Sequence, residues 1–406
     1  MQINTNTRSV NLDPRDAQFV QNPYAAYKAI RAACPAFKWE QYGHWCFAAY
    51  DDVSALLRDR RFGRQILHLA SREELGWPEV PEHIRVFAEH ETHSLLELEP
   101  PVHTRLRGLV NRAFLSRQVE RLRPRLASLC NGLIDGFEAK GEVDLLPNYC
   151  TPIPIVVICE LLGAPVEMAD QFLAWSHDHV AMYMAKRDRM IEDKAVAAVV
   201  AFSAYMRELI RERRKNPGED LLSELIRASD GAGKLSEDEL VTTAILILNA
   251  GHEATVHSLG NAIKALLGNN IRTDLNDKHV EEALRYDAPL HMFTRYALED
   301  LEYNGIALKK GEVVGLMLGA ANRDPARFTN PDVFDPTREA IAHTSFGAGI
   351  HFCVGAPLAR LEMEVGLQVL FERMPRLRLI GTPVYRDAYH FHGLEMLMVS
   401  AHKSSS

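Results

Sequence analysis

The hydrophobic positions along this chain follow a helical period over much of its length. Apolar residues recur at helical spacing from about residue 124 to residue 268, and short runs of alternating hydrophobic and polar residues lie near Trp45–Tyr50, Tyr296–Leu308 and Met396–Ala401. Residues 308–314 read as a turn that leads into a strand. The pattern predicts a mainly α protein with a small β region.

The longest helical pattern covers Glu237–Leu267. Ser236 and Glu239 have the spacing of a capping box, and Asp238 places negative charge at the end of the helix where backbone N–H groups lack partners. The pattern stops at residues 268–270, whose types can take a left-handed conformation and end a helix. About 31 residues at 1.5 Å each give roughly 46 Å, so we expect a long central helix.

Composition narrows the class of protein. With 406 residues, 47% hydrophobic and 25% charged, the chain can form one large domain or two to three smaller ones. Its net charge of −8 argues against nucleic-acid binding. The six cysteines lack CxxC spacing, which is typical of a reducing compartment and argues against a zinc site or a disulfide scaffold. Residues 1–16 are polar, so we expect a cytoplasmic, bacterial-type protein without a membrane anchor.

A segment rich in glycine, Phe346–Gly355, places one cysteine just before a helical pattern. Pro357 suits the first turn of that helix. Gly347 and Gly349 can take positive φ, so the backbone N–H groups can turn toward the sulfur of Cys353. The nearby helix N-terminus favours a thiolate, which is a strong axial ligand for iron. A buried structural cysteine is the simpler alternative, but six spaced matches to one motif make it improbable.

This segment resembles the haem-binding loop of the cytochrome P450 family, F-G-x-G-x-H-x-C-x-G, at every defined position. The resemblance extends from about Asp13 to Leu397. It implies one haem domain over residues 1–406, with the triangular-prism P450 fold, a long central helix over haem b, and no fused reductase. It also implies that Cys353 is the metal ligand and that the cofactor contacts Phe346, Gly347, His351 and Gly355.

Small residues interrupt the apolar central helix at Ala250, Gly251 and Ala254. A glycine in mid-helix costs about 1 kcal/mol relative to alanine. We therefore expect Ala250 and Gly251 to bind the cofactor by letting a flat ring and a diatomic ligand approach the backbone. Glu253 in this apolar setting is unfavourable unless it is hydrated, paired or functional.

The P450 pattern at this point is A-G-x-[DE]-T, whose acid and alcohol help to deliver protons. This chain has Glu253 as the acid but Ala254 at the alcohol position, and Thr255 follows about 100° further round the helix. The resemblance assigns these three positions to catalysis. We hypothesise that Glu253, ordered water and a substrate hydroxyl deliver the protons. His252 is interpreted as a packing or supporting residue and not as an iron ligand.

Glu282 and Arg285 place a carboxylate and a guanidinium on one helical face. The same E-x-x-R spacing, which exposed ion pairs explain, also occurs at Glu82–Arg85, Glu120–Arg123, Glu208–Arg211 and Glu224–Arg227. The motifs that follow the pair at 282 have the order of the P450 family. The resemblance therefore implies that Glu282, Arg285 and Arg338 form a buried network, which fixes geometry more than it adds stability.

The two carboxylates of haem need cationic partners. His103 and Arg107 share a helical face at i, i+4, and a guanidinium can donate two parallel hydrogen bonds to a carboxylate. The resemblance implies that the propionates bind His103, Arg107, Arg295 and His351. Glu99 and Val102 are departures from the D-P-P-E-H sequence of the family.

The resemblance also implies a substrate pocket with mainly apolar walls and His291 as a polar anchor. Its members are expected to be Leu95, Leu96, Leu246, Ile247, Leu290, His291, Met292, Phe293 and Leu394. The alternative for each apolar residue is ordinary packing in the core.

The resemblance implies a monomeric haem-thiolate monooxygenase that inserts oxygen from O2 into a lipophilic small molecule, with no nucleic acid or membrane as partner. Electrons would come from NAD(P)H through a reductase and an acidic ferredoxin-type protein, for which Arg105, Arg112 and Arg117 offer a positive patch. Two alternatives stay open. One is a haem-thiolate enzyme of another class, such as a peroxygenase, an isomerase or a nitric oxide reductase. The other is a non-catalytic haem protein that binds a gas.

Overall fold

The computed structural model divides the chain into two compact units. It describes residues 1–113, 119–183, 187–229, 235–339, 342–389 and 391–400. Unit 1 comprises Met1–Gly63, Arg121–Ile153 and Ala254–Ser406, and unit 2 comprises Arg64–Glu120 and Pro154–Glu253. The boundary between them falls within the helix α12 (Glu237–Gly268), which therefore belongs to both units.

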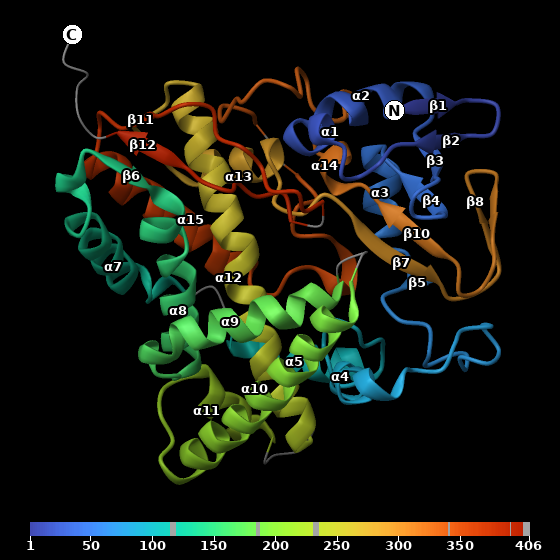
Figure 1. Ribbon diagram of the computed structural model, residues 1–406, viewed down its shortest axis with the longest axis horizontal. Coiled ribbons are helices and arrows are strands. Elements are labelled where there is room, and N and C mark those ends of the chain that lie inside the picture. The colour runs from blue at the N-terminus through green and yellow to red at the C-terminus, as the bar shows by residue number, and fades with distance from the viewer. Residues whose placement is uncertain (114–118, 184–186, 230–234, 340–341, 390, 401–406) are drawn as a thin grey trace. The chain divides into compact units, whose positions relative to one another are not determined.

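A mixed seven-stranded sheet is the main β structure of unit 1 (Figure 1). Its strands, in spatial order, are β1 (Gln2–Asn4), β2 (Ser9–Asn11), β3 (Ala36–Trp39), β4 (His44–Phe47), β10 (Val313–Leu316), β7 (Phe293–Ala297) and β5 (Phe62–Gly63). β2 and β3 pair in parallel, as do β4 and β10, while the other neighbours are antiparallel. The strands β8 (Leu301–Tyr303) and β9 (Ile306–Leu308) form a separate hairpin.

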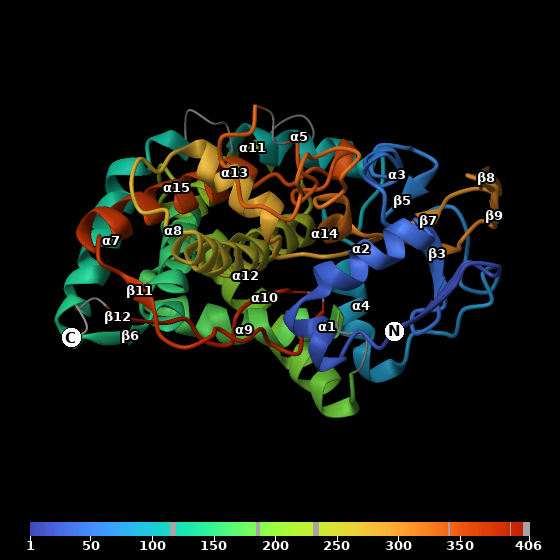
Figure 2. The ribbon, with the colours of Figure 1, turned by 90° about the horizontal axis from the view of Figure 1, so that it is seen from above.

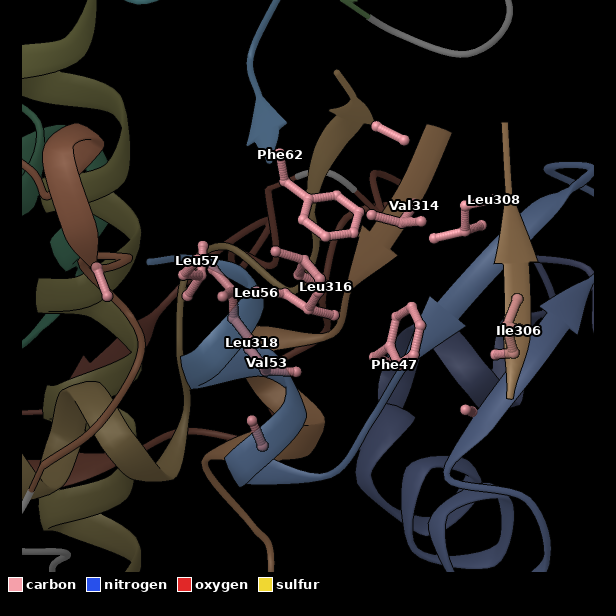
Figure 3. Close-up of a cluster of buried hydrophobic side chains, with 14 residues drawn as sticks. Phe47, Val53, Leu56, Leu57, Phe62, Ile306, Leu308, Val314, Leu316 and Leu318 are labelled. Carbon is pink, nitrogen blue, oxygen red and sulfur yellow. The ribbon is translucent and has the colours of Figure 1, made fainter. Parts of the chain in front are cut away.

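One hydrophobic cluster joins this sheet to the helix α3 (Tyr50–Leu56). Figure 3 shows Phe47, Val314 and Leu316 of the sheet beside Val53 and Leu56 of the helix. All five side chains are buried completely. Burial of such side chains contributes roughly 1.5–3 kcal/mol each, so the cluster fixes the C-terminal end of α3, against which the cysteine loop lies.

The remaining elements of unit 1 are mostly helices. They are α1 (Ala17–Gln21), α2 (Pro23–Ala33), α7 (Arg123–Asp135), α13 (Asp277–Tyr286), α14 (Leu318–Ala321) and α15 (Ala356–Arg373). α15 packs against α7 and α13, as Figures 1 and 2 show. A small sheet joins β6 (Glu142–Asp144), β12 (Met398–Ser400) and β11 (Arg378–Leu379).

The regular secondary structure in the described part of unit 2 is helical, and residues 64–81 form turns and loops. Its helices are α4 (Arg85–Glu91), α5 (Val102–Ala113), α9 (Ala169–Val180), α10 (Arg189–Lys215), α11 (Leu221–Ser229) and, apart from its first two residues, α8 (Pro152–Leu162), together with the first half of α12. α9 packs against α10, where Phe172 and Phe202 stack with ring centroids 5.6 Å apart (Figure 1). In the described residues, no helix is long and apolar enough to cross a membrane.

The structure confirms the mainly α character and the long helix. Ser236 Oγ accepts a hydrogen bond from the Glu239 N–H at 3.1 Å, and a Glu239 carboxylate oxygen accepts one from the Ser236 N–H at 2.8 Å, which is the expected capping box. α12 ends at Gly268, and Asn270 takes the left-handed conformation with φ of 58°. The strand β6, which lies inside the region read as helical, was not predicted.

Candidate active site

The cysteine loop connects the core of unit 1 to α15. The Gly347 N–H donates to Thr344 O at 2.8 Å, and the Cys353 N–H donates to Phe346 O at 3.0 Å, so the loop folds back before the helix begins at Ala356. Cys353 is exposed, whereas the other five cysteines are buried. An exposed sulfur just before a helix N-terminus suits a thiolate that is covered by a bound group.

Two glycines allow this loop to lie close to its neighbours. Gly347 and Gly349 have φ of 69° and 71°, a region that side chains rarely adopt. A Cβ at position 349 would lie 2.4 Å from the carbonyl oxygen of Leu57, at the end of α3, and one at position 347 would lie 3.2 Å from the ring of Phe293. A larger residue at position 349 would displace the loop, and Cys353 with it.

Asn322 holds the segment that precedes the loop, a contact that sequence reasoning missed. Its Oδ1 accepts hydrogen bonds from the N–H of Thr344 at 2.7 Å and from the hydroxyl of Thr344 at 2.9 Å. Its Nδ2 donates to the hydroxyl of Ser345 at 2.8 Å. All three residues are buried, so these bonds fix the start of the loop.

Glu282, Arg285 and Arg338 lie in one network, as the resemblance implied. Nε and Nη2 of Arg285 each donate to the Glu282 carboxylate at 2.7 Å, and Arg338 Nε lies 3.3 Å from the same carboxylate. Arg285 also donates to the carbonyl oxygens of Asn322, Pro331 and Val333 at 2.8–3.1 Å. The network thus connects α13 to the segment before the cysteine loop.

Glu281, next to this network, contacts one residue before the cysteine loop and one residue after it. Its carboxylate accepts two hydrogen bonds from Arg360 of α15, at 2.5 and 3.0 Å, and lies 3.2 Å from His343. Burial alone would raise the pKa of Glu281, but the adjacent His343 and Arg360 outweigh it and lower the pKa to about 2. The Arg360 guanidinium lies over the ring of Phe346, 4.6 Å from its centroid. Sequence reasoning missed this contact, because neither Glu281 nor Arg360 belongs to a recognised spacing.

One stripe of α12, called the exposed stripe below, is partly exposed although the helix around it is mostly buried. Leu246, Glu253 and Ala254 are half-buried and Ala250 is exposed, and these positions follow each other at helical spacing. Thr255 lies on the buried face of the helix, with 5% of its surface exposed. Glu253 and Ala254 therefore share the exposed stripe, while Thr255 does not. Their catalytic roles stay predictions.

The structure gives Gly251 a packing role that the sequence did not show. A Cβ at this position would lie 2.8 Å from Cγ1 of Ile158 on α8, so the glycine allows the two helices of unit 2 to approach. The sequence predicts instead that Gly251 leaves space for the cofactor. Packing against Ile158 is sufficient to explain the glycine, and its contact with the cofactor stays a prediction.

The four expected propionate partners are divided between the two units. In unit 1, Arg295 of β7 is buried and donates to the carbonyl of Thr294 at 2.8 Å, and His351 is half-buried. In unit 2, His103 of α5 is buried and Arg107 Nε donates to Asn111 Oδ1 at 2.8 Å. Their roles toward the cofactor stay predictions.

Of the three arginines of the predicted positive patch, Arg105 is the one whose side chain the structure describes, and it has an acidic partner in unit 2. Arg105 donates to the carboxylate of Glu239 at 2.5 and 3.2 Å, so its charge is partly compensated. Arg117 lies outside the described residues, as does the side chain of Arg112.

The predicted pocket residues differ in exposure. Leu95, Ile247, His291 and Leu394 are buried, Leu246, Leu290, Met292 and Phe293 are half-buried, and Leu96 is exposed. His291 belongs to an internal polar cluster, where its Nδ1 lies 2.8 Å from the hydroxyl of Tyr27. Burial lowers its pKa well below the ordinary value, so the ring is neutral.

Comparison with known proteins gives a consistent result. The family profile described as Cytochrome P450 matches residues 274–374. The chain is 35% identical to the polyketide biosynthesis cytochrome P450 PksS of Bacillus subtilis (strain 168), over 96% of this chain and 98% of that protein. It is 38% identical to the vitamin D(3) 25-hydroxylase of Pseudonocardia autotrophica, over 98% of both chains. Its structure matches epothilone B-bound cytochrome P450epoK with a TM-score of 0.89 and 31% identity, over 97% of this chain and 100% of that one.

The fold and the cysteine loop define a haem-thiolate monooxygenase of the bacterial type. The chain belongs to the cytochrome P450 family. Members of this family bind haem b through a cysteine thiolate, and Cys353 is the cysteine in the matching loop. Its exposure and the close approach of Gly349 to α3 fit such a ligand.

Proposed function

We propose that this P450 inserts one oxygen atom from O2 into a lipophilic small organic molecule, by hydroxylation or epoxidation. The observation that carries the proposal is the complete cysteine loop, with Cys353 exposed before α15, in a chain that aligns with P450 enzymes from end to end. When bound, haem supplies the activation of O2, and Cys353 donates electron density to its iron.

The relatives support a polyketide-like or sterol-like substrate. One is described as acting in polyketide biosynthesis, one as a vitamin D(3) 25-hydroxylase, and one structure contains epothilone B. Leu246 and Ala250, on the exposed stripe of α12, offer an apolar surface to such a molecule. A panel of macrolides, secosteroids and long-chain fatty acids, screened for the spin-state shift of the ferric enzyme, tests this class. Shifts confined to small polar molecules would contradict it.

In this proposal, electrons come from NAD(P)H through a reductase and an acidic ferredoxin-type protein. We also propose a single haem domain that acts as a monomer in the cytoplasm. The decisive measurement is product formation with ferredoxin, reductase, NADH and O2, compared with reactions that lack ferredoxin. Equal product without ferredoxin would contradict this part of the proposal.

Proton delivery is assigned to Glu253, because it shares the exposed stripe with Ala254 whereas Thr255 does not. Glu253 passes protons from ordered water, and a hydroxyl of the substrate takes the place of the missing alcohol. Ala254→Thr should then change the peroxide released per NADH consumed. Unchanged peroxide release and turnover in that variant would count against this role.

Ala254 also favours one second candidate, a peroxide-driven enzyme of the same haem-thiolate class. Such an enzyme takes its oxygen from hydrogen peroxide, which already carries protons. It therefore has less need of an alcohol side chain at position 254. Product formation with hydrogen peroxide alone, at a rate above that with NADH and the electron-transfer proteins, would select this candidate.

A further inference from the structure

Three side chains that face one another in unit 2 have the chemistry of a metal site: His177, His252 and Glu253. A ring nitrogen of each histidine and a carboxylate oxygen of Glu253 all lie within 4.8 Å of one another. His177 lies on α9, while the other two are consecutive residues of α12. Two imidazoles and one carboxylate are a common ligand set for Zn²⁺, which then keeps a water as its fourth ligand.

His252 is already oriented as a ligand. Its Nδ1 lies 2.9 Å from the carbonyl oxygen of Leu248, so that nitrogen carries the proton and Nε2 keeps its lone pair. Only 2% of His252 is exposed, and Nε2 has no hydrogen-bond partner among the described residues. Burial lowers the pKa of His252 to about 4, so the ring is neutral at physiological pH. A buried lone pair without a donor is unusual, and a metal ion satisfies it.

His177 gives the cluster access to solvent. Its ring is exposed, with its centroid 6.2 Å from that of His252. Bonds of 2.0–2.1 Å at tetrahedral angles require ligand atoms about 3.3 Å apart. The ligand atoms lie within 4.8 Å of one another, and a rotamer change of the exposed His177 side chain can bring its ring nitrogen nearer to the two groups on α12.

Two other groups of the same residue types are less suitable. In the group His90, Glu91 and His179, the carboxylate already lies 3.3 Å from His179 Nε2 and accepts a hydrogen bond from Tyr183 at 2.7 Å. In the group Asp287, His291 and His392, the carboxylate accepts hydrogen bonds from Tyr24 and Tyr385. In both groups, tyrosine hydroxyls from outside the group donate to the carboxylate.

We propose that His177, His252 and Glu253 bind one Zn²⁺ ion, or a divalent ion of similar ligand preference, and that the bound ion inhibits turnover. The inhibitory part rests on the proposed role of Glu253, because a carboxylate that coordinates a metal cannot carry protons. The binding part stands on the geometry alone. The proposal of metal binding and the proposal of oxygen insertion can therefore be contradicted independently of each other.

The test is calorimetric titration of the haem-loaded enzyme with Zn²⁺. We expect one ion per chain, and His177→Ala should weaken binding by at least about 10-fold, the smallest loss seen even for outer-shell partners. His177 is exposed, so this variant should fold normally. Glu253→Gln should weaken binding as well.

Two matched variants control for binding elsewhere: His90→Ala removes a ligand of the other group in unit 2, and His68→Ala removes an exposed histidine. Both should bind Zn²⁺ like the wild type. Absence of binding, equal affinity in His177→Ala, or loss of binding in either control would overturn the proposal. In product-formation assays, saturating Zn²⁺ should inhibit the wild type and leave His177→Ala active; equal inhibition would remove the regulatory part.

Discussion

The E-x-x-R spacing on α13 and the same spacing on α10 give ion pairs of nearly equal length but different surroundings. Glu282 and Arg285 approach to 2.7 Å, and Glu208 and Arg211 approach to 2.6 Å. Both side chains of the first pair are fully buried, whereas those of the second are 70% and 62% exposed. The local sequence therefore determines the contact, and the surrounding fold determines its energetic consequence.

The buried pair also has more partners. Glu282 accepts hydrogen bonds from Arg285 and Arg338 and from the Asp335 N–H at 2.7 Å, so its charge is compensated on several sides. This set of contacts links α13 to the approach of the cysteine loop. The exposed pair on α10 links two neighbouring turns of one helix. Substitutions at these and related positions can separate the effect of spacing from that of burial.

Glu282→Gln should have the largest effect. It leaves the Arg285 guanidinium buried without its counter-charge, and breaking such a pair costs about 3–5 kcal/mol. We expect a corresponding decrease in the free energy of unfolding measured in urea, together with poor haem incorporation judged from the reduced carbon monoxide spectrum. Wild-type stability in this variant would mean that the network is dispensable.

Glu281→Gln should have the second-largest effect. It should lower the free energy of unfolding by up to about 3 kcal/mol at pH 7, because each pKa unit corresponds to 1.36 kcal/mol. The folded-state pKa of about 2 is below the ordinary 4.5, so the stabilisation is complete above pH 4.5 and is lost as the pH falls toward 2. Unfolding measured from pH 7 to pH 3 should show the wild type and the variant converging. A constant difference over this range would contradict the assignment.

Glu362→Gln should change stability in the opposite direction. Glu362 is fully buried on α15, its carboxylate has no hydrogen-bond partner among the described residues, and burial raises its pKa well above 4.5. Above pH 4.5 the unfolded chain releases this proton while the folded chain keeps it, so folding becomes less favourable as the pH rises. The variant should be more stable than the wild type at pH 7, and by a smaller margin at pH 5. A loss of stability would reveal an unrecognised partner.

Gly251→Ala tests burial with a residue that carries no charge. Its Cβ would meet Ile158, so we expect a cost of about 1–2 kcal/mol from overpacking. Gly268→Ala is the matched control at the end of the same helix, where nothing lies within 4 Å of the added Cβ, and it should be neutral or slightly stabilising. In a double-mutant cycle, Ile158→Ala should relieve part of the cost. If the two glycine substitutions had equal effects on stability, packing against Ile158 would not explain Gly251, and the expected contact with the cofactor would be the remaining explanation.

The sequence predicted features that depend on neighbouring residues. The capping box of Ser236 and Glu239, the strands near residues 45 and 296–308, and the cysteine loop before α15 all follow from local chemistry. The strand β6 was missed because it lies inside the region of helical period, and it exists through its pairing with β12. Part of the run near Trp45–Tyr50 was also misread, since β4 ends at Phe47 and α3 begins at Tyr50.

The contacts that support the candidate site depend on residues far apart in the sequence. Arg360 reaches Glu281 across 79 positions, and Asn322 reaches Thr344 across 22. No spacing within a helix or a strand encodes these pairs. The E-x-x-R motif is the same on α13 and α10. The resemblance to a known family was therefore needed to identify the buried pair.

Glu208→Gln should have the smallest effect and completes the comparison. Its partner Arg211 stays in water when the carboxylate is removed, so the change in the free energy of unfolding should be below about 0.5 kcal/mol. The salt dependence should be equally informative, because an exposed pair is screened at high ionic strength whereas the pair on α13 is shielded by the protein. We therefore expect the small effect of Glu208→Gln to disappear at 1 M salt and the large effect of Glu282→Gln to persist. If Glu208→Gln destabilised the protein as much as Glu282→Gln, the spacing itself and not the burial would determine the strength of these pairs.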